Sequence, residues 1–420
     1  MNINFIKCYI ITPLIFLIVN CTGNDSTYSV EVTNPLDAER IDEFVIINFD
    51  QLKITQAQQV NKLTVKNGET FIPSQLTDTD NDGIIDGVAV ILNFKPGESI
   101  LLEINLNSPE KSKDDFIKRT YAEIAIKKSA EFKEGKYIGG NYENINNVKV
   151  PYNHIDHDNL FKYEGPGWES DKVGYRFYLD WRNAVDIFGK KTTDMVLKNV
   201  GVQALDQISQ ASYHTMSDWG ADILKVGNSL GIGSVGMLDK GKAIMVSKTD
   251  SITCTVPENG IIKSDIRTRY YGWEVGNKKY NIQTDFSITA GSRLTFTEIQ
   301  IDNEADNILT GIVKHENANL IKQESSIEND WSYLATFGEQ TLFNDNLGMV
   351  IFYKNSELLE ITEDEYSYII VLKARNQKAS YYFGAAWEKE KNGITGEKDF
   401  VSYLNETIQK LNNPIKLIYK

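Results

Sequence analysis

Three of the chain's four histidines lie close together. His154, His157 and His214 fall within 61 of the 420 residues, and the segment "HIDHD" places Asp156 and Asp158 beside the first two. Histidine changes its charge near neutral pH, so it transfers protons readily. The pattern indicates either an acid/base histidine oriented by a carboxylate or a metal site, and it favours acid/base chemistry because no third ligand stands at a recognisable zinc spacing. Surface or purely structural histidines are the alternative.

Two arginines follow in "KVGYRFYLDWR", whose alternation is typical of a strand. A guanidinium binds a carboxylate or sulfate through paired hydrogen bonds, so Arg176 and Arg182 are candidate anion holders. Tyr178 between them could donate a proton. Six residues of straight strand would separate the arginines by roughly 20 Å, so we expect them not to clamp one small group, although both could line a long cleft. A solvated face, with the arginines paired to Asp180 or Glu169, is the alternative.

Aromatic and polar residues on either side of this strand extend the candidate site. Trp168 in "GPGWES" could stack on a sugar ring or fill the core. The segment "SYHTMSDWGADILKVG" adds three further polar or aromatic side chains beside His214. The candidate catalytic residues are therefore His154, His157, Arg176, Tyr213 and His214, and the candidate substrate-binding residues are Trp168, Tyr178, Arg182, Trp219 and Lys225.

The elements that must position these residues are mainly strands. Alternating and β-branched runs predict short strands from 28 to about 107 and again from about 243 onward. The segment 111–134 could be a helix or a strand, and an amphipathic pattern predicts a helix near 396–412. Many strands with few helices predict an all-β sandwich. We expect one large domain at 22–420, with a possible N-terminal β subregion at 28–110.

An acidic loop and the overall charge limit the ligands that the chain could bind. In "DTDNDGIIDG", Asp78, Asp80, Asp82 and Asp86 have a spacing that can bind Ca²⁺, but Ala89 stands where an EF-hand loop has its closing Glu. A polar hairpin turn is the alternative. The net charge of −14 excludes a general nucleic-acid binder and tight adhesion to anionic lipid. A small anionic ligand stays compatible, because a few arginines can set the field of a cleft.

The N-terminus predicts export. A short basic start is followed by the apolar run "CYIITPLIFLIV", which is too short to span a membrane comfortably. The run ends at Cys21, so we expect residues 1–21 to form a signal peptide with a lipoprotein-like end, and Cys21 to be lipidated in the periplasm or at the outer membrane. Ordinary cleavage nearby is the alternative. Only Cys254 would then stay unmodified, so no disulfide framework is expected.

Several of these segments together resemble a known family. The segments are "HDNLFKYEGPGWESDKVGYRFYLDWRNAVDIFGKK", "MSDWGADILKVGNSLGIGSVGM", "YYGW" and "DTDNDGIIDG". They resemble exported proteins classed as a domain of unknown function and encoded in polysaccharide-utilisation gene clusters. One branch is similar to the oligosaccharide dehydratase of marine ulvan degradation. The resemblance implies the β-supersandwich of galactose mutarotases and some polysaccharide lyases.

The resemblance also implies an activity. A dehydratase of this kind removes water from the non-reducing terminal uronic acid of ulvan-type acidic oligosaccharides, giving a 4,5-unsaturated residue. It needs a group that neutralises the carboxylate, a base and an acid, and Arg, His and Tyr suit these tasks. No cofactor is expected apart from possible calcium at the acidic loop. The alternatives are a polysaccharide lyase on uronic-acid polymers and a non-catalytic glycan-binding lipoprotein.

Overall fold

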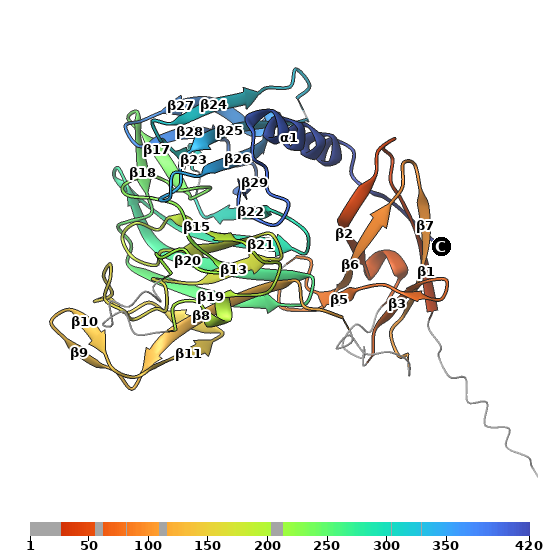
Figure 1. The fold of residues 1–420 in the computed structure, drawn as a ribbon, viewed down its shortest axis with the longest axis horizontal. Coiled ribbons are helices and arrows are strands. Elements are labelled where there is room, and N and C mark those ends of the chain that lie inside the picture. Colours follow the sequence, from red (N-terminus) through yellow and green to blue (C-terminus); the bar gives the residue numbers. More distant parts are fainter. Residues whose placement is uncertain are drawn as a thin grey trace, which may run out of the picture.

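The computed structural model describes residues 27–54, 62–80, 82–108, 116–202, 213–303, 305–328 and 330–420. Strands dominate these residues, and the one α-helix among them is α1 (Glu397–Asn412), at the position where the amphipathic pattern predicted a helix. Antiparallel sheets stack into a large sandwich with a smaller β unit beside it (Figure 1). The predicted all-β sandwich class is therefore confirmed.

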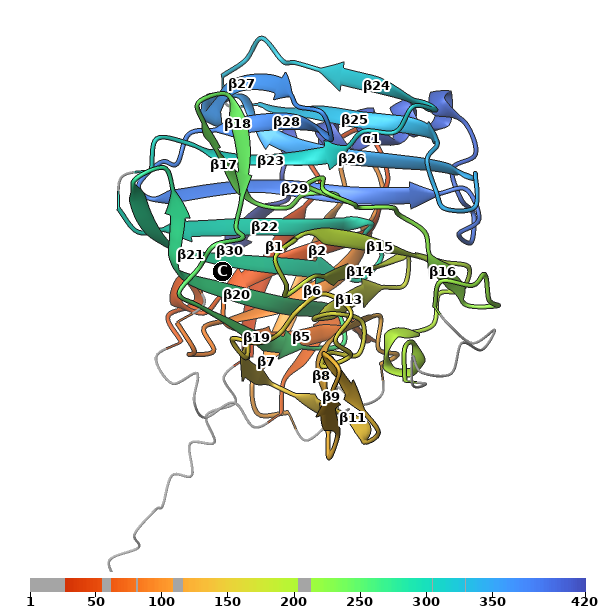
Figure 2. The same ribbon diagram turned by 90° about the vertical axis from the view of Figure 1, so that its left-hand side faces the viewer.

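A nine-stranded antiparallel sheet is the largest sheet of the sandwich. Its long strands lie side by side in Figure 2. In spatial order they are β12 (Asn147–Lys149), β19 (Ser251–Asn259), β20 (Lys263–Val275), β21 (Lys278–Thr289), β22 (Leu294–Ile301), β29 (Lys378–Trp387), β26 (Asn346–Lys354), β25 (Trp331–Glu339) and β24 (Ala318–Gln323).

Two smaller sheets pack against the nine-stranded sheet. The first contains β11 (Asn141–Ile145), β8 (Thr120–Lys128), β13 (Gly167–Ser170), β14 (Val173–Phe177), β15 (Val185–Lys190) and β16 (Gly220–Asp222). The second contains β18 (Lys242–Met245), β17 (Gly236–Asp239), β23 (Ile308–Val313), β28 (Ser367–Leu372) and β27 (Leu358–Glu363). One continuous apolar core joins all three sheets. The segment 111–134, where a helix or a strand was expected, contributes the strand β8 and the first strand of a hairpin, β9 (Glu131–Lys133) with β10 (Lys136–Ile138).

The N-terminal β unit has its own apolar core. One of its sheets contains β1 (Thr27–Thr33), β7 (Ser99–Asn105), β3 (Thr64–Asn67), β4 (Thr70–Phe71) and the C-terminal strand β30 (Lys416–Tyr419), and the other contains β2 (Arg40–Asn48), β6 (Gly87–Phe94) and β5 (Ser74–Thr77). Apart from β30, the strands of this unit lie between residues 27 and 105, in the region where an N-terminal β subregion was expected. The pairing of β1 with β30 returns the chain's end to its start, a contact that the strand pattern did not predict.

Charged contacts and α1 fix the small unit to the sandwich. Arg119 donates to both carboxylate oxygens of Asp42 at 2.6 and 2.7 Å and pairs with Asp171 at 2.6 Å. The apolar stripe of α1, centred on Phe400 and Leu404, packs on β25 and β26. Within the described ranges there are also three short 3-10 helices: η1 (Asp50–Leu52), η4 (Leu197–Asn199) and η5 (Asn355–Glu357).

None of the helices in the described ranges is long and apolar enough to cross a membrane. Cys21 and the expected signal peptide lie outside the described residues, so lipidation stays a prediction. Cys254 is a free, fully buried cysteine.

Candidate active site

The six-stranded sheet has two chemically different faces because its strands alternate. One face carries Trp168 and Tyr175, which pack into the main core, where Trp168 stacks on Phe286 at 5.2 Å between ring centroids. The opposite face carries charge. Arg176 on β14 lies directly opposite Asp186 on β15 in the antiparallel register. A strand face that is charged yet buried needs internal pairing of those charges, and the following contacts provide it.

Arg176 has a fully paired guanidinium. It donates to Asp186 Oδ2 from Nε at 3.0 Å and from Nη2 at 2.7 Å, and to Asp222 Oδ2 from Nη2 at 2.6 Å. Nη1 contacts Glu164 Oε2 at 3.3 Å and the Tyr213 hydroxyl at 3.2 Å. Only 2% of the residue is exposed. The expectation that Arg176 binds a substrate carboxylate is therefore wrong, because its hydrogen-bonding capacity is already used inside the protein.

Arg182 reaches the same carboxylate as Arg176. Its Nη2 donates to Glu164 Oε1 at 2.9 Å, and its guanidinium lies 3.7 Å from the centroid of the Tyr178 ring. The predicted separation of roughly 20 Å was wrong because the strand ends early. β14 stops at Phe177, and a turn closed by the hydrogen bond from Asn183 N to Asp180 O at 3.1 Å returns the chain.

Two phenols contact Arg176, and one of them, Tyr178, also lies against Arg182. Tyr178 donates to Asp186 Oδ2 at 2.5 Å and accepts from Arg176 at 2.8 Å. Burial raises the pKa of Tyr178 well above its ordinary value, and it raises that of Tyr213 to about 12. Both phenols therefore keep their protons at neutral pH and act as hydrogen-bond donors.

Two carboxyl groups of the network have pKa values shifted in opposite directions. Burial would raise the pKa of Glu164, but the charges of Arg176 and Arg182 outweigh it and lower that pKa to about 2. Burial and the nearby charge of Asp222 raise the pKa of Asp186 to about 6, even beside Arg176. Sites that transfer protons often contain two groups of the same kind whose surroundings shift their pKa values apart.

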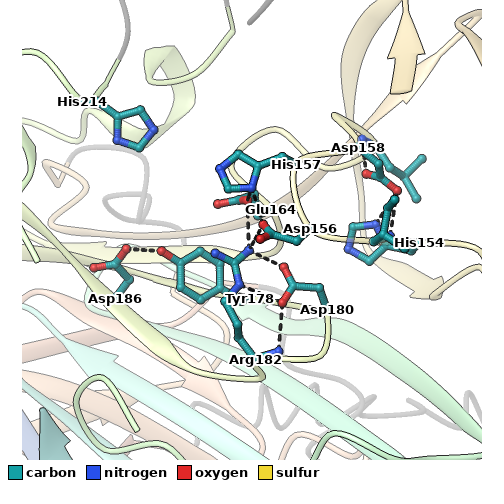
Figure 3. A network of polar contacts seen from close by, with 12 residues as sticks. His154, Asp156, His157, Asp158, Glu164, Tyr178, Asp180, Arg182, Asp186 and His214 are labelled. Carbon is teal, nitrogen blue, oxygen red and sulfur yellow. Dashed lines mark hydrogen bonds and ion pairs between the residues drawn. The ribbon is translucent and has the colours of Figure 1, made fainter. Parts of the chain in front are cut away.

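Two histidines border this network and stay accessible (Figure 3). The side chain of His157 is 68% exposed, and its Nδ1 lies 2.5 Å from Asp156 Oδ1. The side chain of His214 is 47% exposed, and its Nδ1 lies 3.1 Å from Asp222 Oδ2. A carboxylate on Nδ1 orients the ring and favours a proton on that nitrogen. His214 also lies 4.3 Å from the Tyr213 ring, centroid to centroid.

His154 does not lie at the border of the network. Its Nδ1 bonds to Asp158 Oδ2 at 2.8 Å, its ring meets Phe161 edge-on, and its side chain is 3% exposed. In Figure 3 the pair of His154 and Asp158 lies apart from the other labelled groups. We therefore interpret His154 as a structural histidine of the 150–162 loop, and its expected catalytic role is corrected.

The other candidate residues have different positions. Trp168 is fully buried and donates to Thr295 Oγ1 at 2.9 Å, so the expectation of an exposed sugar-stacking ring is wrong. Trp219 is half-buried against Phe188, in the small cluster that also contains Tyr213. Lys225 is exposed, and its charge acts on His315. No contact in the described part of the chain joins Lys225 to the arginine network.

The acidic residues of the site were not predicted from the sequence. Glu164, Asp186 and Asp222 hold the network together, but none of them was a candidate. The signal was present in "NAVDIFGKK" and "GADILKVG", where a lone carboxylate interrupts an apolar strand. A buried carboxylate in such a strand requires a cationic partner, and Arg176 is that partner.

The network contains more acids than bases. Its five carboxylates face two guanidinium groups, the carboxylates being Asp156, Glu164, Asp180, Asp186 and Asp222. An acidic ligand can therefore bind here only together with further protons or a cation, since like charges repel. Burial raises the pKa values of Asp186 and Asp156, so these two carboxyl groups of the network are suited to take such protons.

Among the residues that the structure describes, two groups could hold a metal ion. Donor atoms of Asp156, His157 and Glu164 lie within 4.8 Å of one another. Arg182 already contacts both of those carboxylates, at 2.6 Å and 2.9 Å, so a metal ion would compete with a guanidinium there.

The second group is the acidic loop, where donor atoms of Asp78, Asp80 and Asp82 also lie within 4.8 Å of one another. Asp86 instead accepts two hydrogen bonds from Thr79, at 2.6 and 2.7 Å. Calcium binding by this loop stays a prediction.

The fold and the site together define a β-sandwich protein with a buried charge network bordered by two accessible histidines. The chain belongs to the family described as Domain of unknown function (DUF4861), whose model matches residues 32–417. A search of curated proteins gave no match.

Several solved structures are similar in fold. An alpha-mannosidase from Enterococcus faecalis V583 and a glycosyl hydrolase family 38 protein from Enterococcus faecalis are each 10% identical, with TM-scores of 0.45 and 0.42 over 94% of this chain. The matches cover 46% and 47% of those chains, so this chain spans about half of their length. An aldose 1-epimerase structure from Klebsiella pneumoniae is 10% identical, with a TM-score of 0.28 over 59% of this chain and 84% of that one.

Proposed function

We propose that the protein is a carbon–oxygen lyase that removes water from the non-reducing terminal uronic acid of acidic, ulvan-type oligosaccharides. The observation that supports this best is the pair of accessible histidines, each set on a carboxylate at Nδ1, beside one buried network of arginines and phenols. The resemblance of the central motif to a family with such a dehydratase supplies the substrate class. We assign the acid and base roles from the geometry of the two histidines.

The reaction needs one proton taken and one given. A base removes the C5 proton, which is acidified by the adjacent carboxylate, and the electron pair forms the C4–C5 double bond. The C4–O bond breaks, and a proton from an acid converts the leaving hydroxyl to water. His157 and His214 are our candidates for base and acid, with the Tyr213 hydroxyl as the alternative acid, because it already contacts Arg176 and lies beside His214.

The substrate carboxylate needs a positive partner. Arg182 is better suited than Arg176, because 10% of its side chain is exposed, compared with 3% for Arg176. Arg182 also contacts the same carboxylate, Glu164, as His157. Protonated histidine would supply further positive charge in this acidic site. Placing positive charge where negative charge develops on the carboxylate stabilises the transition state.

An absorbance assay tests this proposal. Oligosaccharides that end in a saturated uronic acid should gain near-ultraviolet absorbance with the wild-type protein. We expect the rate to fall ~10²–10⁴-fold in His157→Ala or His214→Ala, as is typical for loss of a positioned acid or base. His315→Ala is the matched control, because His315 lies outside the network.

Full activity in both His157→Ala and His214→Ala would contradict our placement of the acid and base. Binding without any absorbance gain would favour the non-catalytic glycan-binding alternative. Absorbance accompanied by chain cleavage would favour the polysaccharide-lyase alternative.

We also propose that the protein is exported and anchored through lipid on Cys21, on the basis of the apolar run that ends at that residue. A single acyl chain binds a membrane reversibly, so stable anchoring would need several chains on this cysteine. Cys21→Ala should move the protein from the membrane fraction to the soluble one. Persistence of the variant in the membrane fraction would argue against this anchor.

A further inference from the structure

We propose that a cavity on the outer face of the nine-stranded sheet, centred on Arg269, is a second binding site for an acidic saccharide. The cavity measures about 300 Å³ and lies on β20, β21 and β22 and on the turn before β29. Its position on the other layer of the sandwich separates it from the arginine network of the six-stranded sheet. Only the choice of acidic sugars as probes rests on the proposed function.

One row of side chains across four neighbouring strands forms the floor of the cavity. Arg269 pairs in register with Gln283, Gln283 with Gln300, and Gln300 with Lys378. Residues directly opposite in antiparallel strands share a face, so these four side chains form one polar row. Three inter-strand spacings make this row about 14 Å long, enough to contact more than one sugar ring.

Arg269 differs from most arginines of the chain in having no acidic partner. Among the described residues, six of the eight arginines form ion pairs with carboxylates. Arg269 instead donates from Nε to Gln283 Oε1 at 2.7 Å, and no carboxylate in the described ranges lies within 4.0 Å of its guanidinium. In a protein with a net charge of −14, an unpaired guanidinium that lines a cavity is suited to a bound anion.

A chain of hydrogen bonds holds this arginine in place. Arg267 Nε donates to Asp285 Oδ1 at 2.5 Å, and Gln283 Nε2 donates to Asp285 Oδ2 at 2.6 Å. Gln283 Oε1 is thereby oriented toward Arg269. A donor that is already fixed before the ligand arrives loses less side-chain entropy on binding, so this relay favours affinity.

The remaining lining residues suit the hydroxyl groups of a sugar. Side-chain amides dominate, and an amide both donates and accepts hydrogen bonds. The amides are Asn281, Gln283, Gln300, Asn376 and Gln377. Tyr271, which is 41% exposed, adds an aromatic ring that could stack on a sugar.

The acidic residues near the cavity are already engaged. Asp302 accepts two hydrogen bonds from Asn281, at 2.5 and 2.6 Å. Glu298 receives Lys378 Nζ at 3.3 Å. Lys378 offsets the charge of Glu298, whereas Asp302 keeps its negative charge at the end of the cavity next to Asn281. Arg269 is the cation of the lining without an acidic partner, so the chemistry recognised beside it is an oxyanion with neighbouring hydroxyl groups, either a uronate carboxylate or a sulfate ester.

Titration calorimetry with full-length protein tests this site. The probes are two matched oligosaccharide series, one with uronic acid and no sulfate and one with sulfate esters and no uronic acid. Arg269→Ala should weaken binding of at least one series ~10–100-fold, the range expected for a lost charge-assisted hydrogen bond. A loss confined to one series identifies the anion as carboxylate or sulfate.

Lys279→Ala is the charge-matched control, since Lys279 is an exposed lysine on β21 that does not line the cavity. Arg269→Lys, which keeps the charge but not the planar fork, covers the case in which the alanine variant folds poorly. Unchanged affinity in both Arg269 variants, or an equal loss in Lys279→Ala, would overturn the second site. Turnover of a short substrate should stay unchanged in Arg269→Ala, so the result does not depend on whether the proposed reaction is correct.

Discussion

Two sheet faces of this protein carry arginines, but they use them differently. At the six-stranded sheet, Arg176 on β14 and Arg182 in the turn that follows are enclosed by carboxylates and phenols, and every donor group of Arg176 has a partner. On the nine-stranded sheet, Arg269 lines an open cavity without an acidic partner. A guanidinium that is fully paired inside a protein positions its neighbours, whereas an unpaired one is available to a ligand.

The difference also shows where chemistry and where binding should be sought. Beside the six-stranded sheet the accessible groups are mainly the histidines at the border of the network. Arg176 holds Asp222, which orients His214, and the slightly exposed Arg182 contacts Asp156 beside His157 and is also our candidate partner for the substrate carboxylate. In the nine-stranded sheet the arginine itself is accessible. An arginine predicted from sequence to bind an anion can therefore have either role, and only its acidic neighbours decide between them.

The largest effect should come from removing both accessible histidines. We expect His157→Ala combined with His214→Ala to abolish measurable dehydration while the fold is retained, because neither side chain is buried in the core. On a short substrate, the reaction rate should be lost in the double variant and unchanged in Arg269→Ala. This contrast would separate catalysis from binding. Comparable rates in these two proteins would remove the distinction between the two faces.

Removal of Arg176 should mainly lower the stability of the fold. Arg176→Ala leaves Asp186, Asp222 and Glu164 buried without their cation, and breaking such an arrangement typically destabilises a protein by ~3–5 kcal/mol. Arg269→Ala should change the free energy of unfolding by less than ~0.5 kcal/mol, as at most surface positions. Chemical denaturation of both variants checks this contrast, and a stable Arg176→Ala protein would show that the network is not structural.

More of the fold than of the site could be predicted from the sequence. Alternation in segments such as "YNIQTDFSIT" predicts strands because a half-buried sheet requires it. Pairing across long distances, such as β1 with β30, leaves no local pattern. The histidine cluster was visible because histidine is rare in this chain, but the pattern could not show that His154 is buried and His157 exposed.

The predicted strand through Arg182 failed for a physical reason. Alternation continues past Phe177, but the chain turns at Asp180, whose carboxylate accepts the backbone N–H and Nε of Arg182, each at 2.9 Å. Local side-chain hydrogen bonds of Asp compete with strand pairing and are typical of turns. This turn brings two arginines onto Glu164, which a straight-strand reading excluded.

The pH dependence of stability should distinguish two carboxyl groups of the network. Because the pKa of Glu164 is lowered to about 2, its ionised form stabilises the fold above its ordinary pKa of 4.5, and this stabilisation is lost as the pH falls through about 2. Glu164→Gln should therefore be less stable than wild type near neutral pH, with the gap narrowing in acid. Urea denaturation across pH 3–7 measures this gap, and a gap that is constant with pH would contradict the ionic role of Glu164.

Asp186 should show the opposite slope. Its pKa is raised to about 6, so the wild-type fold loses stability as the pH rises from the ordinary pKa of 3.8 through about 6. The stability of Asp186→Asn relative to wild type should therefore increase over this range, even if the variant is less stable at low pH through lost hydrogen bonds. The same denaturation series provides the measurement, and a relative stability that fell with rising pH would contradict the raised pKa.

The smallest effect on activity should come from the acidic loop of the N-terminal unit. Asp80→Ala and Asp82→Ala are expected to leave turnover within about twofold of wild type, since the loop belongs to a unit with a separate core. A calcium-dependent rise in melting temperature that both variants lose would support a cation site. Loss of turnover at an unchanged melting temperature would instead link this loop to the chemistry.

Mass spectrometry of the product tests the central proposal most directly. A defined oligosaccharide with a saturated terminal uronic acid, incubated with wild-type protein, should lose the mass of one water and keep its full chain length. The same substrate incubated with the His157→Ala, His214→Ala double variant should keep its mass. A wild-type product of unchanged mass, or two shorter sugars in its place, would contradict the dehydratase.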